Sequence, residues 1–184
     1  MLHIFLADGF EEIEAFTTMD VLRRCGLTVQ TIAIAGKRTV VGAHGIPTMA
    51  DTIINRSELK ESEGFILPGG MPGAKTLLAC EPFHKALLLH AMHNRLIAAI
   101  CAAPMVLGLH GILEGHRATC YPGFEHHLHK AAYSGNLLEI DGNIITAKGP
   151  AAVLPFAFAI AARFVDDATI AQVRKDLLLT DEQG

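Results

Sequence analysis

Short apolar segments without proline alternate along this chain with longer stretches that have the spacing of helices. The apolar segments run from Leu2 to Ala7, Thr28 to Ala35, Gly64 to Leu67, Leu96 to Ile100 and Arg117 to Cys120. Most of them are apolar throughout instead of alternating with polar residues, which is typical of strands covered on both faces. Because strands that alternate with helices form parallel sheets, the pattern predicts a doubly wound α/β sandwich.

The boundaries of the helical stretches can be placed from glycine and proline. The first helix is expected from about Glu11 to Cys25, because Gly26 stands where the glycine that follows a helix belongs. We expect the others at about Pro82 to His93, Pro104 to His110, Gly123 to Ala131, Ala151 to Phe164 and Ala168 to Leu178.

Two segments break this alternation, and both favour antiparallel pairing. The segment "LLEIDGNIITAKG" places Asp141-Gly142 between two apolar strands, which is a strong local signal for a hairpin. The segment "KRTVVGAHGIPTMAD" gives a weaker signal for a second excursion at the edge of the sheet. The fold class predicted is therefore a mainly parallel sheet sandwiched by helices, with a small antiparallel hairpin.

Composition limits the classes of protein that the chain can belong to. It has 184 residues, of which 51% are apolar, and we expect one α/β domain from residue 1 to residue 184. The formal net charge of -4, with scattered Lys and Arg, argues against nucleic acid as a partner. No secretory signal is recognisable at the start, and no apolar run reaches the roughly 20 residues that span a bilayer. The four cysteines lie far apart without CxxC spacing, so we expect free thiols in the cytoplasm and no membrane partner.

Cys101 stands at the corner where one strand meets the next helix, in the stretch "AAICAAPMVLG". Ligands of open parallel sheets bind beyond the carboxyl ends of the strands. At this corner a side chain is held beside free backbone N–H groups and the positive end of a helix. Such an environment is expected to lower the pKa of the thiol and to favour the thiolate, which is the nucleophile. The alternative for any single cysteine is a small buried hydrophobe.

A second strand end, in "FILPGGMPGA", carries Gly69 and Gly70 directly after a buried strand. Backbone N–H groups in such a turn can point toward a bound oxygen atom. The turn would form one half of an oxyanion hole, and the N–H of Ala102 would form the other half. The alternative is a tight strand-to-helix turn without a ligand.

A third strand end, in "LADGFEEIEAF", leads into a helix that begins with Glu11, Glu12 and Glu14. Acidic side chains in a first turn complement the helix dipole, and that explanation suffices for exposed ones. At roughly 100° per residue, Glu14 and Glu11 project into the apolar arc of the helix, whereas Glu12 points toward the side of Arg23, where we expect solvent. A carboxyl group held among apolar residues has a raised pKa. Because Glu11 can act as a helix cap, Glu14 is the better prediction for a buried functional acid.

With Cys101, Gly70 and Glu14 drawn from three strand ends, the sequence resembles the ThiJ/PfpI family, also called the DJ-one superfamily. The motifs "DGFEEIEA", "LPGGMPGA", "AAICAAP" and "TAKGP" follow one another in the family's order and spacing, and the match covers essentially the whole chain. The resemblance implies a flavodoxin-like sandwich that is usually a homodimer. It also implies that Cys101 is the nucleophile, that Glu14 is a protonated acid hydrogen-bonded to the sulfur, and that Gly70 and Ala102 are backbone donors.

Departures from related patterns narrow the chemistry. Members described as proteases or as glyoxalase-like chaperones have histidine directly after the cysteine, whereas this chain has Ala102, which argues against a Cys-His protease. In the most similar group a histidine often precedes the proline near residue 120, and here Tyr121 takes that place in "TCYPG". A phenol with an unperturbed pKa of about 10 is a poor base at neutral pH, so the acid-base work falls mainly on Glu14. Whether His126 assists is left open.

Other histidines and cysteines have simpler explanations. The pair His126 and His129 in "GFEHHLHK" has metal-ligand spacing, but no further ligand is evident and an exposed polar helix is favoured, so we expect no metal. His44 aligns with a segment that in the family approaches the partner subunit's site, which makes it an accessory residue. Arg24 is expected to be a surface ion-pairing residue near the same interface. Cys120 is predicted to be a buried hydrophobe, and its position near a strand end beside the corner allows it to approach Cys101.

Two functions from different classes follow from these residues. The first is an enzyme that acts on 2-oxoaldehydes or their early adducts without a cofactor, in which the Cys101 thiolate adds to the carbonyl, Gly70 and Ala102 stabilise the oxyanion, and Glu14 moves the proton. The alternative is a redox-responsive protective protein or holdase chaperone in which Cys101 is oxidised to the sulfinate. A core cysteine in a noncatalytic fold is a third reading, which three converging motifs disfavour.

Overall fold

A mainly parallel sheet of seven strands forms the centre of the protein, which we describe from a computed structural model. The structure describes residues 1–56 and 59–179. Neighbouring strands are parallel except β10 and β11, as the sequence predicts. Across the sheet the order is β10 (Leu138–Asp141), β11 (Ile144–Ala147), β7 (Leu96–Ile100), β6 (Gly64–Leu67), β1 (Leu2–Leu6), β2 (Val29–Ala33) and β5 (Thr52–Ile53).

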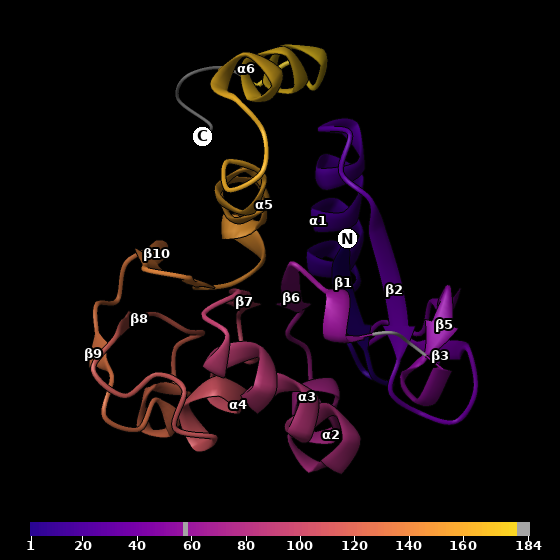
Figure 1. Cartoon of the computed structure of the whole chain (residues 1–184), viewed down its shortest axis with the longest axis vertical. Helices are drawn as coiled ribbons and strands as arrows, with labels where there is room; N and C mark the ends of the chain where they lie inside the picture. Colours follow the sequence, from indigo (N-terminus) through magenta and orange to yellow (C-terminus); the bar gives the residue numbers. More distant parts are fainter. Residues whose placement is uncertain (57–58, 180–184) are drawn as a thin grey trace.

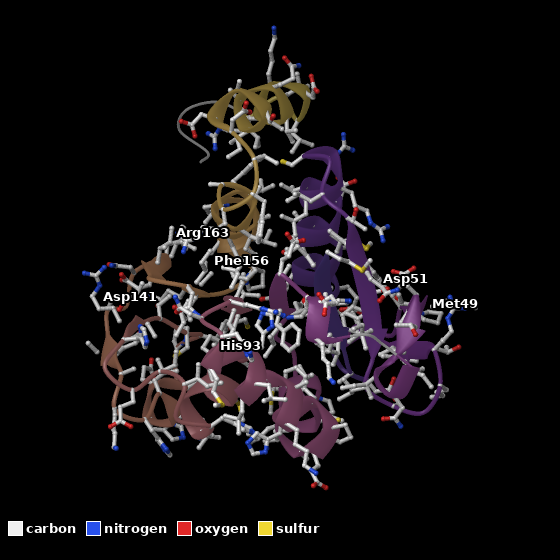
Figure 2. The ribbon with its side chains drawn as sticks, in the orientation of Figure 1. Met49, Asp51, His93, Asp141, Phe156 and Arg163 are labelled. Carbon is white, nitrogen blue, oxygen red and sulfur yellow. The ribbon has the colours of Figure 1, made fainter. Side chains whose placement is uncertain are left out.

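Helices cover both faces of this sheet (Figure 1). On one face α1 (Glu12–Arg24) packs against α5 (Val153–Ala161), and Phe156 is fully buried in the core of that layer (Figure 2). The opposite face carries α2 (Gly73–Ala79), α3 (Glu81–Met92) and α4 (Pro104–Leu109), above a core that includes Phe5, Phe65 and Phe83. The last helix, α6 (Asp167–Asp176), lies beyond α5. The predicted doubly wound sandwich is confirmed.

Both predicted antiparallel excursions are present. Strands β10 and β11 are joined by the two residues Gly142 and Asn143, and Gly142 adopts φ +60°, which a tight hairpin turn requires. Strands β3 (Thr39–Val41) and β4 (Pro47–Met49) form a separate two-stranded sheet instead of joining the edge of the main one. We call the segment from Thr39 to Met49 the β3–β4 hairpin.

Two expected elements differ strongly from the structure. The helix predicted for Gly123 to Ala131 is wrong, because only a single 3-10 turn, η3 (Glu125–His127), forms there. Gly123 has φ +96°, and the chain at His127 runs so close to α4 that a Cβ on Gly108 would be 2.2 Å from the His127 carbonyl oxygen. The strand predicted for Arg117 to Cys120 shortens to β8 (Arg117–Ala118), which pairs only with β9 (Ala132–Tyr133) outside the main sheet.

Short elements complete the description. The 3-10 turns are η1 (Ile54–Arg56), η2 (Leu59–Glu61) and η4 (Pro150–Ala152), of which η4 replaces the start of the helix expected from Ala151. Helix α2 was not expected from the sequence. In the described part of the chain, no helix combines the length and the apolar character needed to cross a membrane.

The order of the strands determines where a site can form. From β1 the chain moves to β2 on one side, whereas β6 lies on the other side of β1. In open α/β sheets, the loops at the carboxyl ends of strands that flank such a switch form the binding crevice. The loops that follow β1, β6 and β7, together with the first turn of α1, contain Glu11 to Glu14, Gly69-Gly70 and Cys101, so the fold brings the three predicted motifs to one end of the sheet.

Candidate active site

Cys101 occupies a strained corner directly after β7. Its φ of 63° lies in the left-handed region, which residues with a side chain adopt rarely and mostly where surrounding contacts hold them there. Two backbone hydrogen bonds fix the corner: the Cys101 N–H donates to the carbonyl oxygen of Ala147 at 2.9 Å, and the Cys101 carbonyl accepts from the N–H of Tyr121 at 2.8 Å. The side chain remains partly exposed. This is the geometry of a nucleophile elbow.

Glu14 is the buried carboxyl group at this corner, as predicted. The residue is 1% exposed, and its Oε2 accepts a hydrogen bond from the N–H of Gly69 at 2.7 Å. Its Oε1 is also buried and has no hydrogen-bond partner among the described residues. The carboxyl group lies close enough to the thiol of Cys101 for each group to shift the pKa of the other. Glu14 therefore connects the loop after β6 with the cysteine after β7.

The protonation of this pair corrects the sequence prediction. Burial raises the pKa of Glu14 to about 7. Burial and, after it, the charge of Glu14 raise the pKa of the Cys101 thiol to about 12, so the predicted lowered thiol pKa is wrong. The backbone groups at the corner lower the pKa of the thiol less than burial and the neighbouring carboxylate raise it. At neutral pH the first proton leaves Glu14 while the thiol keeps its own.

Backbone donors nevertheless surround the sulfur. The N–H groups of Ala102 and Gly70 interact with Cys101 and act to lower the pKa of its thiol, against the larger effect of burial. Gly70 has φ +89°, and a Cβ there would lie 2.4 Å from the Gly9 carbonyl oxygen, so only glycine fits. A Cβ on Gly69 would lie 2.7 Å from the Cβ of Cys101. The structure thus brings all four predicted residues, Cys101, Glu14, Gly70 and Ala102, to one point.

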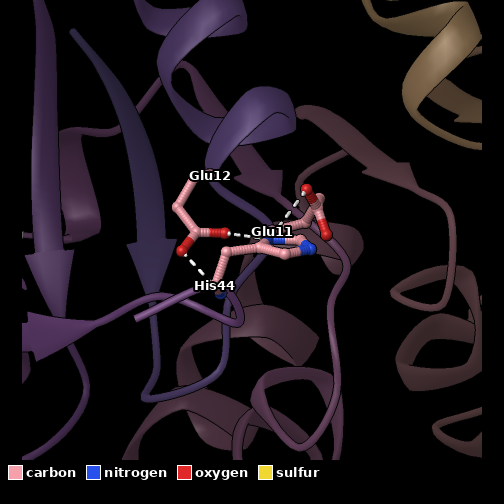
Figure 3. A group of neighbouring side chains, drawn as sticks. All are labelled: Glu11, Glu12 and His44. Carbon is pink, nitrogen blue, oxygen red and sulfur yellow. Dashed lines mark hydrogen bonds and ion pairs between the residues drawn. The ribbon is translucent and has the colours of Figure 1, made fainter. Parts of the chain in front are cut away.

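The other two glutamates of the motif are placed differently from expectation. Glu12, predicted to face solvent, is 5% exposed, and its carboxylate accepts hydrogen bonds from the backbone N–H and from Nδ1 of His44, both at 2.8 Å (Figure 3). Glu11 directly precedes the helix but its side chain does not cap it, and its Oε1 lies 3.7 Å from the same Nδ1. Helix periodicity could not reveal this arrangement, because the partner comes from the β3–β4 hairpin, which is distant in sequence.

This trio is also the one group in the described residues whose ligand atoms are close enough to share a metal ion. The three atoms, one each from Glu11, Glu12 and His44, lie within 4.8 Å of one another. Glu12 Oε2 and His44 Nδ1 already bond to each other, so an ion would have to displace that hydrogen bond. The pair His126 and His129, weighed from the sequence, gains no third ligand among the described residues.

The accessory residues lie around the corner to different degrees. The backbone of Tyr121 lies beside that of Cys101, because the Tyr121 N–H donates to the Cys101 carbonyl oxygen. Tyr121 is 46% exposed, and its ring lies close to Gly149 of the "TAKGP" motif. His126 is exposed and packs on the ring of His127 at 3.9 Å, and it is not among the groups that interact with Cys101 or Glu14. Arg24 forms the expected surface ion pair, with Asp20 at 2.7 Å. Cys120 is fully buried, as predicted.

A flavodoxin-like sandwich with a strained cysteine at a strand end and a buried glutamate beside it defines a class of proteins to which known sequences can be compared. A model of the DJ-1/PfpI family matches residues 2–163, and the chain belongs to that family. The resemblance inferred from the motifs is confirmed.

Individual relatives cover the chain to different extents. Protein DJ-1 homolog B of Arabidopsis thaliana is 35% identical over 97% of this chain, but the chain spans only 41% of that relative's length. A Caenorhabditis elegans protein named glutathione-independent glyoxalase DJR-1.2 is 35% identical over 82% of this chain and 80% of its own length. A mutant DJ-1 superfamily protein from Salmonella typhimurium, known from a crystal structure, is 34% identical in sequence to this chain. The match covers 97% of this chain and 98% of the Salmonella chain, and the two structures superpose with a TM-score of 0.93.

Proposed function

We propose that this protein is a cysteine-dependent enzyme of the glyoxalase or deglycase type, which converts 2-oxoaldehydes or their early adducts into hydroxyacids. The observation that carries this proposal is the convergence on the Cys101 sulfur of the Glu14 carboxyl group and the N–H groups of Gly70 and Ala102. A nucleophile, an acid-base group and two oxyanion donors are the parts that carbonyl addition and proton transfer require. The glyoxalase name of the 35% identical relative supports the same class of reaction.

The reaction balances without an external oxidant. As the sulfur adds to the aldehyde carbon, the thiol proton passes to the Glu14 carboxylate, and the N–H groups of Gly70 and Ala102 stabilise the oxyanion that forms. Glu14 returns that proton to the oxyanion, which gives the hemithioacetal and restores the carboxylate. The carboxylate then takes the proton of the former aldehyde carbon and delivers it to the neighbouring carbonyl carbon, while the hydroxyl proton moves to the oxygen of that neighbouring carbon, which gives a thioester of the hydroxyacid. Water hydrolyses the thioester, so methylglyoxal yields lactate and glyoxal yields glycolate, and the thiol is restored. The raised pKa of Glu14, about 7, suits a group that must both accept and donate a proton near neutrality.

Replacement of the nucleophile tests this proposal. Purified protein should convert methylglyoxal into lactate, and Cys101→Ser should lose that turnover by at least ~100-fold, because a hydroxyl is a far weaker nucleophile at neutral pH. Cys80→Ser is the matched control, since Cys80 is also partly exposed but lies at the end of α2, away from the corner. Full turnover by Cys101→Ser would reject the proposed enzyme.

The second candidate is a redox-responsive protective protein or holdase chaperone in which Cys101 is oxidised to the sulfinate. Its support is access together with a neighbouring acid: Cys101 and Cys80 are partly exposed, whereas Cys25 and Cys120 are buried, and Cys101 has the Glu14 carboxyl group beside its sulfur. A protonated Glu14 next to the sulfur could donate a hydrogen bond to a sulfinate oxygen. Mass spectrometry after a mild peroxide pulse should find oxidation concentrated at Cys101, and modification equal at Cys80 and Cys101 would count against this function.

We further propose that the protein acts in the cytoplasm as a homodimer, on a small carbonyl substrate or a glycated adduct. Free cysteines fit a reducing compartment. Exposed apolar side chains on the start of α1 and on the β3–β4 hairpin would be covered by a second copy; they are Ile13, Val41, Ile46 and Met49, and Figure 2 shows Met49 at the rim of the hairpin. Light scattering after size exclusion measures the assembly directly.

A further inference from the structure

Glu12 is the buried charge that the chemistry proposed for Cys101 leaves unused. A carboxylate withdrawn from water is costly unless hydrogen bonds satisfy it. Although burial alone would raise the pKa of Glu12, hydrogen bonds from His44 and from backbone N–H groups hold that pKa below its usual value. Both oxygens are occupied, Oε1 by the His44 N–H and Oε2 by His44 Nδ1. Because a carboxylate can only accept, Nδ1 is the donor of the second bond.

The turn of the β3–β4 hairpin is shaped around this carboxylate. A Cβ on Gly42 would lie 2.2 Å from Glu12 Oε1 and 2.5 Å from its Cγ, so the backbone of the turn passes against the side chain. Figure 3 shows His44 reaching from that turn to the first turn of α1. The contact with Glu12 therefore requires glycine at position 42 and a hydrogen-bond donor at position 44.

The same turn is bound to the loop between β1 and α1 along its length. The N–H of Gly9 donates to the Val41 carbonyl oxygen at 2.7 Å, and the N–H of Ala43 donates to the Phe10 carbonyl oxygen at 2.8 Å. The N–H of Val41 donates to Asp8 Oδ1 at 2.8 Å. The hairpin thus covers the outer side of this loop.

The inner side of that loop carries the oxyanion donor. The N–H of Glu11 donates to the Gly69 carbonyl oxygen at 2.9 Å. The missing side chain of Gly70 is what allows close packing there, since a Cβ would lie 2.5 Å from the Glu11 nitrogen. Gly69 bonds to Glu14 and Gly70 faces the Cys101 sulfur. The loop between β1 and α1 is consequently clamped between the hairpin and the donors of the site.

We propose that Glu12 and His44 are positioning residues for the Cys101 centre, which hold the loop between β1 and α1 against Gly69-Gly70 and so keep the Gly70 N–H aimed at the sulfur. Neither residue is assigned a contact with the substrate. A displacement of about 1 Å in a group that aligns reacting atoms can cost on the order of 100-fold in rate. Part of the clamp survives loss of the imidazole, because the His44 backbone N–H still binds Glu12, and a smaller effect of about tenfold is expected.

Two pairs of variants test the clamp from different sides. His44→Ala should lower kcat for methylglyoxal about tenfold with KM changed less than about twofold, and His44→Asn should recover most of the loss because its amide nitrogen can replace Nδ1. Gly42→Ala should impair kcat similarly by displacing Glu12, whereas Gly36→Ala, which meets open space, should not. His44 is exposed, so its variants are expected to fold, and circular dichroism would establish that.

The turnover readout depends on the proposed enzymatic function, so the rate of Cys101 alkylation by iodoacetamide is measured in the same variants. That rate should also fall in His44→Ala and Gly42→Ala, even if the wild type has no methylglyoxal turnover, and this separates failure of the clamp from failure of the enzyme. Glu81→Gln, which alters the exposed first-turn glutamate of α3, is the matched control and should alkylate at the wild-type rate. Wild-type alkylation in His44→Ala, or equal impairment of His44→Asn and His44→Ala, would overturn the proposal.

Discussion

At the scale of single residues, the Cys101 centre combines the strained backbone of Cys101 with the carboxyl group of Glu14, which burial shields from solvent. Among the described residues, the Glu14 carboxyl group accepts a hydrogen bond from the N–H of Gly69, lies beside the Cys101 thiol and forms no ion pair. Its negative charge is therefore poorly compensated, in contrast to that of Glu12, which two N–H groups of His44 stabilise. Two glutamates only two positions apart are thus prepared for opposite tasks, one to exchange a proton and the other to stay ionised.

The protonation of Glu14 predicts a pH-dependent stability. Its pKa is raised from 4.5 to about 7 in the folded protein by burial, so folding favours the protonated form. The stability that this proton contributes is complete below pH 4.5 and is lost as the pH rises to about 7, by ~3 kcal/mol in all. Glu14→Gln stays neutral and keeps an oxygen for the Gly69 N–H. The variant should match the wild type near pH 4.5 and exceed its free energy of unfolding above pH 7 by up to that amount.

Urea unfolding between pH 4.5 and pH 8 measures this difference. Glu81→Gln serves as the control, because Glu81 is exposed and Lys85 lowers its pKa. A gap between Glu14→Gln and the wild type that does not change with pH would show that burial of the charge is not its cause.

The sequence was sufficient to predict which residues lie together around Cys101, but not how their charges are balanced. Cys101, Gly70 and Glu14 were identified because strand ends and one helix face are local features. The role of Glu12 and the raised pKa of the Cys101 thiol were missed because both depend on partners brought in by the fold, His44 for one and Glu14 for the other. Periodicity assigns a side chain to a face and says nothing of what a distant hairpin places there.

At the scale of elements, agreement between local signals and the structure depends on how much of each element is fixed by its own residues. The β10–β11 hairpin forms where Asp141-Gly142 predicts it, since turn chemistry is local. The segment from Gly123 to Ala131 has helical composition and forms only η3, because contact with α4 at Gly108 requires a different path. The segment that contains β8 has the composition of a strand, but it does not join the main sheet beside β7 because β11 occupies that position.

The hairpin turn gives a prediction for a single element. Gly142 has φ +60°, and a Cβ there would meet nothing within 4 Å, so the cost of a side chain comes from the backbone alone. Gly142→Ala should lower the free energy of unfolding by about 1 kcal/mol. Gly36→Ala, in equally open space without a positive φ, should be neutral or slightly stabilising in the same urea experiment. Equal effects of the two substitutions would contradict this explanation.

At the scale of the whole molecule, the two ends of the sheet hold buried ionisable groups of opposite kind. Glu14 lies at the carboxyl ends of the strands, and its ionisation opposes folding as the pH rises. His90 of α3 is 3% exposed, stacks on Phe65 at 3.9 Å and bonds through Nε2 to the carbonyl oxygen of Leu96, at the beginning of β7. Its protonation opposes folding as the pH falls. The stability of the fold is therefore expected to be limited from both directions.

Acid unfolding tests the second limit. Burial lowers the pKa of His90 from 6.5 to about 4, so between these values the unfolded chain takes up a proton that the folded protein does not. The stability that neutral His90 contributes is complete above pH 6.5 and is lost as the pH falls toward 4, with a slope of at most about 1.4 kcal/mol per pH unit. His90→Gln removes the titrating group and keeps a donor for the Leu96 carbonyl.

The difference in unfolding free energy between wild type and His90→Gln isolates this residue, because Glu14 and the buried His3 titrate in both proteins. That difference should shift in favour of the variant as the pH falls from 6.5 to 4. Leu89→Gln, at an exposed position of the same helix that carries no titrating group, should instead differ from the wild type by the same amount at every pH. Parallel curves for the wild type and His90→Gln would mean that His90 takes up its proton without opening the fold, and the acid limit would then have to come from another group.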